Sequence, residues 1–374
     1  MAMSHDELYE IFSWLPAKSI HKFKASSKIL SEFLEDPHFA LKQAKNSLTK
    51  CDTWFFMQTH NHIEFHALLG EQDSSGVPKD MLGFLSTSAK ILSSSNGLLL
   101  CSATGRNQVE LFVTNPATQS YVWIPTPKNS ENNIDADLKI ILECDQDDFN
   151  VFLFDIPNWG SNLDCKVYNH KEGSWKENQV KKFFTGTPYF RPYIISYNFD
   201  NNDNNKPTML RVPKEARRGS HDNSCDMRIF KWGKVNESSQ SICLVRLRKR
   251  VFTIWVLMNY ELGSWRRILK VRVKAMLGSM EQNPSVKGFI ILKDDLVFAT
   301  EKKVHAYGLT NDRYMKLWEV CDHGFKDSGF CFIPYFDTLR PCGIGAKNLC
   351  YFRRDILSQE HDVTSTYNSG FECR

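Results

Sequence analysis

Three segments of the sequence repeat one pattern, and this pattern constrains the fold more than any other feature. In each segment an asparagine ends a run of strand-forming residues, about five mostly polar residues follow, and an aromatic residue comes six positions after the asparagine. The pairs are Asn115 and Tyr121, Asn169 and Trp175, and Asn259 and Trp265. A strand, a polar turn and a second strand in this order predict repeated β-hairpins.

The spacing of the aromatic residues suggests a circular repeat. Trp318 marks a weaker copy, and a further indistinct copy near residues 229–232 would make the period about 45 to 54 residues. This is close to the length of a β-propeller blade, and residues 50–358 leave room for about six or seven blades. We expect the repeated aromatic residues to pack one blade on the next rather than to hold a ligand.

The first fifty residues follow a different periodicity. Apolar residues fall at helical spacing on one face: Leu8, Ile11, Phe12 and Leu15. Pro16 breaks this helix, a second helical segment runs from Lys18 to about Leu34, and Asp36-Pro37 restarts the chain before a third over residues 39–48. The expected fold class is therefore α+β and multidomain, with three helices over residues 1–48, an all-β, propeller-like domain over residues 49–358 and a flexible tail over residues 359–374.

Three short helices in about fifty residues make a marginal core on their own. A partner that covers the remaining apolar surface is therefore expected for this segment.

Composition narrows the class of protein. The formal net charge of the 374 residues is +4, which does not indicate a nucleic-acid binder. The N-terminal residues lack the basic and apolar segments of a signal peptide, and the best apolar stretch, Val251 to Met258, is too short to span a membrane. We expect a cytoplasmic or nuclear protein with reduced thiols and no membrane association.

No metal site, cofactor or catalytic motif is expected. Cys321, Cys331, Cys342 and Cys350 contain no CxxC pair, and the group His60, His62 and His66 has no evident fourth ligand. The sequence holds no GxSxG, HExxH or Walker motif.

Charge is unevenly distributed along the chain. Residues 129–165 contain nine acids and one base, whereas residues 206–274 contain 17 bases and five acids. Within the basic stretch Arg246, Arg248 and Arg250 alternate along an expected strand and share one face. They are candidates for contact with a target, and solvated strand faces are the alternative interpretation.

The segment from Asp6 to Phe39 resembles an F-box. The matching positions are Leu15, Pro16, Lys18, Ser19, Ile20, Phe23, Lys24, Ser27, Lys28, Asp36, Pro37 and Phe39. Downstream, residues 93–101, 115–118, 167–177 and 251–265 resemble the F-box-associated domain of plant F-box proteins, which is kelch-like and of β-propeller type. No Gly-Gly occurs anywhere, so the repeats differ from typical kelch blades.

The resemblance implies a non-catalytic substrate receptor of a Skp, cullin and F-box ubiquitin ligase. The F-box would bind a Skp-family adaptor and through it a cullin scaffold, and the C-terminal domain would hold a target protein that the sequence does not identify. The expected docking and supporting residues in the F-box are Leu8, Ile11, Leu15, Pro16, Ile20 and Phe23.

Two other functions stay open. The first is a propeller that binds protein or glycan and carries a degenerate F-box, because the usual Leu-Pro at the start is Met3-Ser4 and Glu7 and Leu30 replace an apolar residue and a tryptophan. The second is a propeller enzyme that uses a metal or carboxylates.

Overall fold

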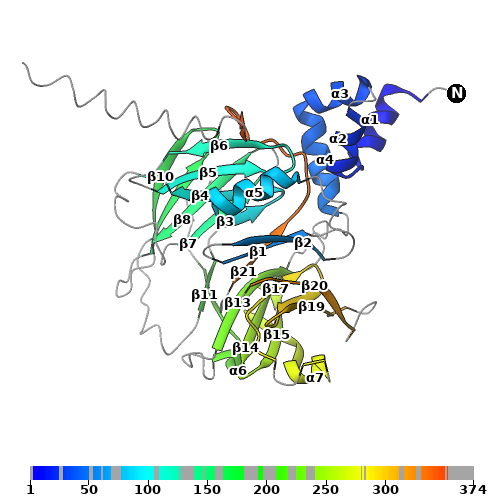
Figure 1. Ribbon diagram of the computed structural model, residues 1–374. Coiled ribbons are helices and arrows are strands. Elements are labelled where there is room, and N and C mark those ends of the chain that lie inside the picture. The colour runs from blue at the N-terminus through cyan, green and yellow to red at the C-terminus, as the bar shows by residue number, and fades with distance from the viewer. Residues whose placement is uncertain are drawn as a thin grey trace, which may run out of the picture.

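The structure is a computed structural model that pairs a small helical unit with a larger β body (Figure 1). It describes residues 3–24, 28–49, 54–59, 62–68, 77–104, 109–125, 127, 139–145, 148–155, 163–180, 193–196, 208–217, 225–232, 241–278, 280–281, 284–310, 316–325, 330–349 and 352. The predicted tail over residues 359–374 and His60 lie outside these ranges. The domain boundary after residue 48 stays a prediction.

The described part of the N-terminal segment forms four helices. They are α1 (His5–Ser13), α2 (Ala17–Lys24), α3 (Lys28–Glu35) and α4 (Pro37–Thr49). The expectation of three helices is not confirmed, because the segment predicted as one helix over residues 18–34 contains both α2 and α3. Helix α2 ends at Lys24 and α3 begins at Lys28, so the structure describes two helices where one was expected.

Local sequence explains where α1 and α4 begin. Ser4 Oγ accepts a hydrogen bond from the backbone N–H of Glu7, and the Glu7 carboxylate accepts one from the backbone N–H of Ser4. This capping box satisfies two N–H groups at the start of α1. At α4, Asp36 accepts a bond from the His38 N–H, and Pro37 occupies the first helical position, where its missing N–H costs nothing.

The β body is a five-blade propeller arrangement, so the predicted propeller-like architecture is confirmed. Blade I contains β2 (Ile63–Ala67), β1 (Trp54–Gln58) and β21 (Cys331–Tyr335). Blade II contains β3 (Lys90–Ser95), β4 (Leu98–Thr104), β5 (Val109–Asn115), β6 (Ser120–Ile124) and β22 (Lys347–Asn348). Blade III contains β7 (Lys139–Cys144), β8 (Phe149–Asp155), β9 (Leu163–Asn169) and β10 (Ser174–Val180).

The remaining strands complete the body. Blade IV contains β13 (Cys225–Trp232), β14 (Ser241–Arg248), β15 (Val251–Asn259) and β16 (Ser264–Arg272), and blade V contains β17 (Gly288–Leu292), β18 (Asp295–Ala299), β19 (Lys303–Gly308) and β20 (Leu317–Asp322). A separate two-stranded sheet is formed by β11 (Tyr193–Ser196) and β12 (Thr208–Arg211), and short helices are α5 (Lys79–Ser88), α6 (Lys214–Arg217) and α7 (Val273–Leu277).

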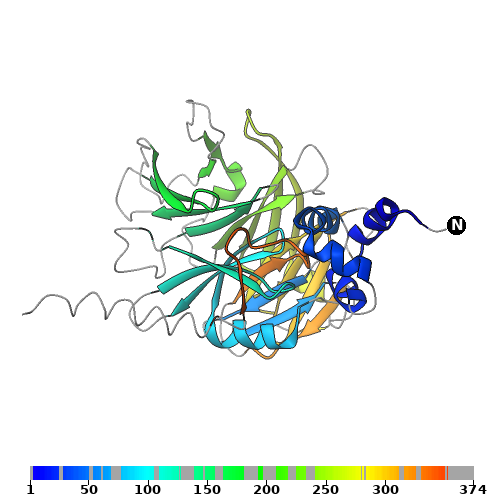
Figure 2. The ribbon, with the colours of Figure 1, turned by 90° about the horizontal axis from the view of Figure 1, so that it is seen from above.

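The two ends of the β body meet in blade I. Strand β1 pairs in antiparallel register with β21, with Trp54 opposite Tyr335, so the first strand shares a sheet with the strand that follows blade V. Seen from above, the sheets follow one another around the body, and α1–α4 project from one side (Figure 2). This closure means that residues before and after the blades lie close to each other and to the helices.

The estimate of six or seven blades is higher than the five that the described residues form. Part of the chain length goes instead to α5, α6, α7 and the β11–β12 sheet. This sheet contacts blade IV through the same kind of hydrogen bond that joins blades II and III. The Trp265 indole donates to the Arg211 carbonyl at the end of β12. In the same way, the Trp175 indole of blade III donates to the Pro125 carbonyl just after β6. Residues of α6 and β11 also pack on buried Leu244 and Trp255 of blade IV. The β11–β12 sheet thus lies against blade IV as blade II lies against blade III.

The repeated asparagine makes the same kind of hydrogen bond in each hairpin. The side-chain carbonyls of Asn115, Asn169 and Asn259 accept hydrogen bonds from backbone N–H groups of the following turn, at 2.9, 3.0 and 2.8 Å. Four residues after each asparagine the backbone is left-handed, with φ of 52° at Gln119, 64° at Gly173 and 58° at Gly263. Asparagine fixes the turn, and glycine meets its backbone requirement in two of the three copies.

No helix in the described part of the chain is long and apolar enough to cross a membrane.

Candidate functional site

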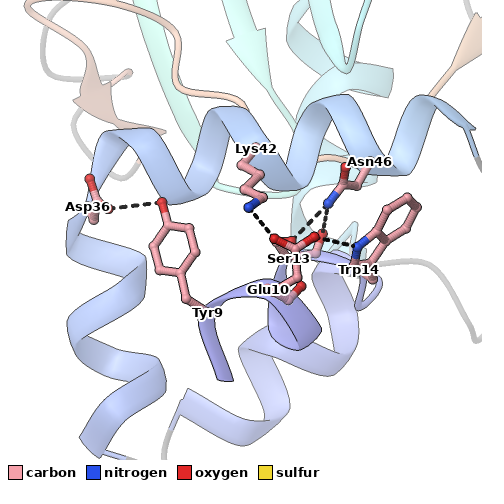
Figure 3. Close-up of polar contacts among 7 residues, drawn as sticks. All are labelled: Tyr9, Glu10, Ser13, Trp14, Asp36, Lys42 and Asn46. Atoms are coloured by element: carbon pink, nitrogen blue, oxygen red, sulfur yellow. Dashed lines mark hydrogen bonds and ion pairs between the residues drawn. The ribbon is translucent and has the colours of Figure 1, made fainter. Parts of the chain in front are cut away.

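Polar contacts fix α1 against α4 (Figure 3). Lys42 on α4 forms an ion pair with Glu10 on α1, and the Trp14 indole donates to the same carboxylate at 3.1 Å. Asn46 on α4 donates to the Ser13 hydroxyl at 2.8 Å. The hydrogen bonds from Lys42 and Trp14 lower the pKa of Glu10, so the carboxylate stays ionised to a lower pH than an ordinary glutamate.

A second contact closes the other end of the helical unit. The Tyr9 hydroxyl donates to Asp36 Oδ2 at 3.2 Å, and burial together with the neighbouring Asp36 raises the pKa of Tyr9 to about 12. Beneath these polar contacts the rings of Tyr9, Phe33 and Phe39 pack in a cluster with centroid distances of 5.1 to 5.3 Å. The helices therefore form one packed unit with its own small core.

The six residues expected at the docking surface divide into three groups. Ile20 is fully buried in the helical core, so it supports the fold and does not reach the surface. Leu8 and Leu15 are half-buried against the same core, whereas Ile11, Pro16 and Phe23 are exposed. The exposed fraction is 48% for Ile11 and 50% for Phe23, which is high for large apolar side chains.

The structure adds Trp14 to the candidate surface. Trp14 is 41% exposed and lies three positions after Ile11, so the two side chains share a face at the end of α1. Its indole N–H is held by Glu10, which fixes the ring without burying it. The sequence pattern missed Trp14 because it lies outside the buried stripe; the pair Ile11 and Trp14 at i and i+3 is the signal that would have identified a second apolar face.

Two further exposed apolar residues lie on the helical unit. Met3 precedes α1 and is 49% exposed, and Ile29 near the start of α3 is 36% exposed. We define the exposed helical surface as Met3, Ile11, Trp14, Pro16, Phe23 and Ile29. These exposed apolar side chains are the candidates on the helical unit for contact with a protein partner.

Gln43 joins the helical unit to the propeller. Its side-chain carbonyl accepts a hydrogen bond from the Leu339 backbone N–H at 2.9 Å, and its amide group donates to the Leu15 carbonyl at 3.1 Å. Gln43 is fully buried, and Leu339 and Ala117 pack into the core of the helices. One face of the helical unit is thus covered by the propeller, while the exposed helical surface remains open.

The segment over residues 336–342, which we call the strap, anchors this junction to blades II and III. The Asn115 amide donates to the carbonyls of Thr338 and Arg340 at 2.9 and 2.6 Å. The Arg340 guanidinium donates to the carbonyls of Asp145 and Asp148 in blade III. Gly97 is required beneath the strap, because its φ is +88° and a Cβ there would lie 1.9 Å from Thr338 Oγ1.

The three arginines proposed as target contacts are not equivalent. The Arg246 guanidinium donates to the backbone carbonyls of Glu215 and Ala216 and lies 5.3 Å from the centre of the Trp255 ring. Arg246 therefore holds α6 on blade IV. Arg248 ends β14 and is half-buried, whereas Arg250 is exposed in the turn after it.

The residues weighed as metal ligands have other contacts. His62 and His66 both hydrogen-bond to the Glu64 carboxylate, which also accepts the Gly324 N–H. Among the described residues no group of three or more histidine, cysteine or acidic side chains is arranged to bind a metal ion. The eight cysteines within the described ranges form no disulfide.

Comparisons with known proteins point to F-box proteins. The chain is 24% identical to an F-box protein of Arabidopsis thaliana, in an alignment that covers 91% of this chain and 98% of the relative. A second Arabidopsis thaliana F-box protein is 29% identical over 131 residues, which cover 32% of this chain and 30% of the relative. No family model matches the chain.

Solved structures give weaker similarities. An oligogalacturonate lyase in complex with manganese aligns with a TM-score of 0.33 and 12% identity, over 64% of this chain and 65% of that one. Prolyl oligopeptidase B from Galerina marginata aligns with a TM-score of 0.34 and 7% identity, over 87% of this chain and 57% of that one.

Proposed function

We propose that the protein is the substrate-recognition subunit of a Skp, cullin and F-box ubiquitin ligase. The observation that carries this proposal is the exposed helical surface, which presents large apolar side chains on a packed unit fixed to a propeller. Binding of an adaptor would remove these side chains from water, and because Ile11, Trp14 and Phe23 are already about half buried, covering the rest of each contributes about 1 kcal/mol. The naming of the relatives as F-box proteins supports the same assignment.

The proposed mechanism is proximity. A Skp-family adaptor binds the helices, a cullin scaffold binds the adaptor, and the propeller holds a target protein near a ubiquitin-conjugating enzyme. Tethering raises the effective concentration of a target lysine at the enzyme, and no residue of this chain takes part in the chemistry.

The junction at Gln43 and the strap suits this role. Because Gln43, Asn115 and Arg340 connect α4 to blades II and III through buried hydrogen bonds, the helices have a defined orientation relative to the propeller. A receptor with a fixed orientation holds its target at a constant distance from the adaptor. This limits the volume that the bound target explores and so raises its effective concentration.

The sequence departures at Met3-Ser4 and Glu7 have a structural explanation. Ser4 and Glu7 form the capping box of α1, so they stabilise the helix that carries Ile11 and Trp14. They do not by themselves indicate that the segment has lost its function.

Reconstitution tests the proposal. The full chain is mixed with a recombinant plant Skp-family adaptor and a cullin, and the mixture is separated by size-exclusion chromatography. The proposal expects one complex that contains the chain and the adaptor at equal stoichiometry and retains the cullin. A chain that elutes alone while it still binds proteins or glycans would instead support a propeller binding module with no ligase role.

A further inference from the structure

A cavity of about 370 Å³ opens on blade V, beside the segment that follows α7; we call it the blade V cavity. The segment after α7 contributes Met280 and Glu281, the turn between β18 and β19 contributes Glu301 and Lys302, and β19 contributes His305. Ligand sites in proteins have volumes of about 300 to 1,000 Å³, so the blade V cavity has the size of a small ligand site.

Two fully buried side chains fix the carboxylate of Glu281 at the wall of this cavity. The Thr300 hydroxyl donates to Glu281 Oε1 at 2.6 Å, and His305 Nε2 lies 3.5 Å from the same oxygen. Thr300 and His305 are both 0% exposed, whereas the side chain of Glu281 keeps 26% of its surface exposed. The carboxylate therefore has a defined position and stays open on one side.

His305 contributes an imidazole that carries no charge at neutral pH. Burial lowers the pKa of His305, although the neighbouring Glu281 opposes this effect. Its Nδ1 is buried and has no hydrogen-bond partner in the part of the chain that the structure describes. Buried polar atoms without a partner are rare in proteins, and this one belongs to a side chain that lines the cavity. It is an indication of a binding site that is independent of the carboxylate.

The other charges of the blade V cavity are paired, with one exception at its rim. Lys303 forms an ion pair with Glu319 at 2.6 Å, and Glu301 lies 3.8 Å from Lys287. Lys302 is exposed in the turn and forms no ion pair with any residue that the structure describes. Its long side chain is free to turn away from the cavity.

The carboxylate of Glu281 thus has no compensating cation. Within the described ranges, no lysine or arginine lies at ion-pair distance from it, and its two partners are a hydroxyl and an uncharged imidazole. A carboxylate held in this way attracts a cationic group more strongly than one in open water, because the protein around it screens charge less.

The blade V cavity is remote from the helices. The backbone N–H of Met280 donates to the Leu277 carbonyl at 3.0 Å, so the cavity begins directly after α7. Figure 1 shows α7 and the helices α1–α4 at opposite ends of the molecule. A partner bound in the cavity would leave the exposed helical surface accessible.

We propose that the blade V cavity binds a lysine or arginine side chain of the target protein; this inference rests on the proposed receptor function. The ammonium or guanidinium group would pair with Glu281, and the aliphatic part of the side chain would pack on Met280, which is 60% exposed. One uncompensated carboxylate matches a single charged side chain better than a free polyamine, which carries several charges.

Removing the charge of Glu281 without removing its hydrogen bond gives a sharp test. In Glu281→Gln the side-chain carbonyl can still accept from Thr300. The control Glu261→Gln removes the same charge from an exposed turn of blade IV. Binding to the full-length chain is measured by saturation-transfer NMR with a short peptide of Gly and Ser that has one central Arg or Lys. The same peptide with a central Gln and the polyamine spermidine are the comparators.

The proposal expects the Arg and Lys peptides to bind and the Gln peptide not to bind. Affinity should fall at least about fivefold in Glu281→Gln, stay unchanged in Glu261→Gln and be no lower in Lys302→Gln, which removes the cation at the rim. Equal affinity in wild type and Glu281→Gln would overturn the proposal, as would an equal loss in Glu261→Gln or tighter binding of spermidine.

A further variant separates loss of charge from loss of fold. Glu281→Asp keeps the carboxylate and should bind the Arg peptide better than Glu281→Gln, whatever the melting temperatures of the two variants. Binding by Glu281→Asp that is no better than by Glu281→Gln would contradict the proposal. Because the assay contains no adaptor, a chain that fails to bind the adaptor can still bind the peptide, and the two failures are distinguishable.

Discussion

The side-chain carbonyl of Gln43 on α4 accepts a hydrogen bond from the backbone N–H of Leu339, 2.9 Å away and 296 residues later in the chain. This contact joins the helical unit to the strap, which Asn115 and Arg340 connect to blades II and III. The two parts of the molecule therefore meet through a buried polar group with several partners, and such groups are costly to disrupt.

Gln43→Ala should loosen the junction more than it unfolds the propeller. The substitution leaves the Leu339 N–H and the Leu15 carbonyl without their partner, at an expected cost of about 1 to 3 kcal/mol. Hydrogen exchange should accelerate in α4 and the strap while β17–β19 of blade V stay protected. The exposed neighbour Lys45→Ala serves as control, and uniform acceleration across all blades would contradict a local role.

Asn115→Ala should destabilise the protein more than Asn259→Ala, although both occupy the same position in the repeat. Asn115 is buried and contacts Ala117, Thr338 and Arg340, so its loss should cost about 2 to 4 kcal/mol. Asn259 is exposed and bonds the N–H of Leu262, which should limit the cost to about 0.5 to 1 kcal/mol. Urea denaturation of the two variants measures the difference, and equal losses would show that the strap contacts contribute little.

The free energy of unfolding should fall as the pH is lowered, because of the titration of His66 and Glu64, which lie between blades I and V. Burial lowers the pKa of His66 below its ordinary value of 6.5, despite the opposing effect of Glu64. Burial raises the pKa of Glu64, but hydrogen bonds from Gly324, His66 and His62 outweigh it and leave the pKa below 4.5. In both cases the unfolded state binds protons more readily than the folded state.

The change in stability with pH has the same sign for His66 and Glu64: both stabilise the folded protein less as the pH falls. The His66 contribution is lost as the pH falls from about 6.5 toward its lowered pKa, and the Glu64 contribution is lost below 4.5 as its folded pKa is crossed. The melting temperature should therefore be lower at pH 5.5 than at pH 7.5. His66→Gln should reduce this difference, and exposed His38→Gln should not; a pH difference unchanged in His66→Gln would refute the assignment.

Part of the fold could be predicted from the sequence because it depends on local rules. The asparagine turns, the glycines at left-handed positions and the break at Pro16 each follow from the chemistry of one or two residues. The strap could not be predicted, because its contacts join residues such as Asn115 and Arg340 that are more than 200 positions apart. The number of blades could not be predicted either, because the chain between the repeats also forms α5, α7 and the β11–β12 sheet.

The docking role of the candidate residues stays a prediction. Helical spacing groups apolar residues on the N-terminal segment, but it does not show which apolar residues fill the core. Ile20 turns inward onto Phe33 and Phe39, and Trp14 stays outside because Glu10 binds its indole. Those positions depend on how the four helices pack against one another, which a periodic pattern in one helix does not contain.

The most direct measurement of the central claim is the affinity of a Skp-family adaptor for Ile11→Glu, with Leu262→Glu on blade IV as a matched control. Both residues are large, apolar and exposed, so neither change should unfold the protein. A charge buried at the adaptor interface should weaken binding by about 2 kcal/mol, or roughly 30-fold, in Ile11→Glu. Calorimetry that shows this loss for Ile11→Glu and none for Leu262→Glu supports the account, whereas unchanged adaptor affinity in Ile11→Glu would contradict it.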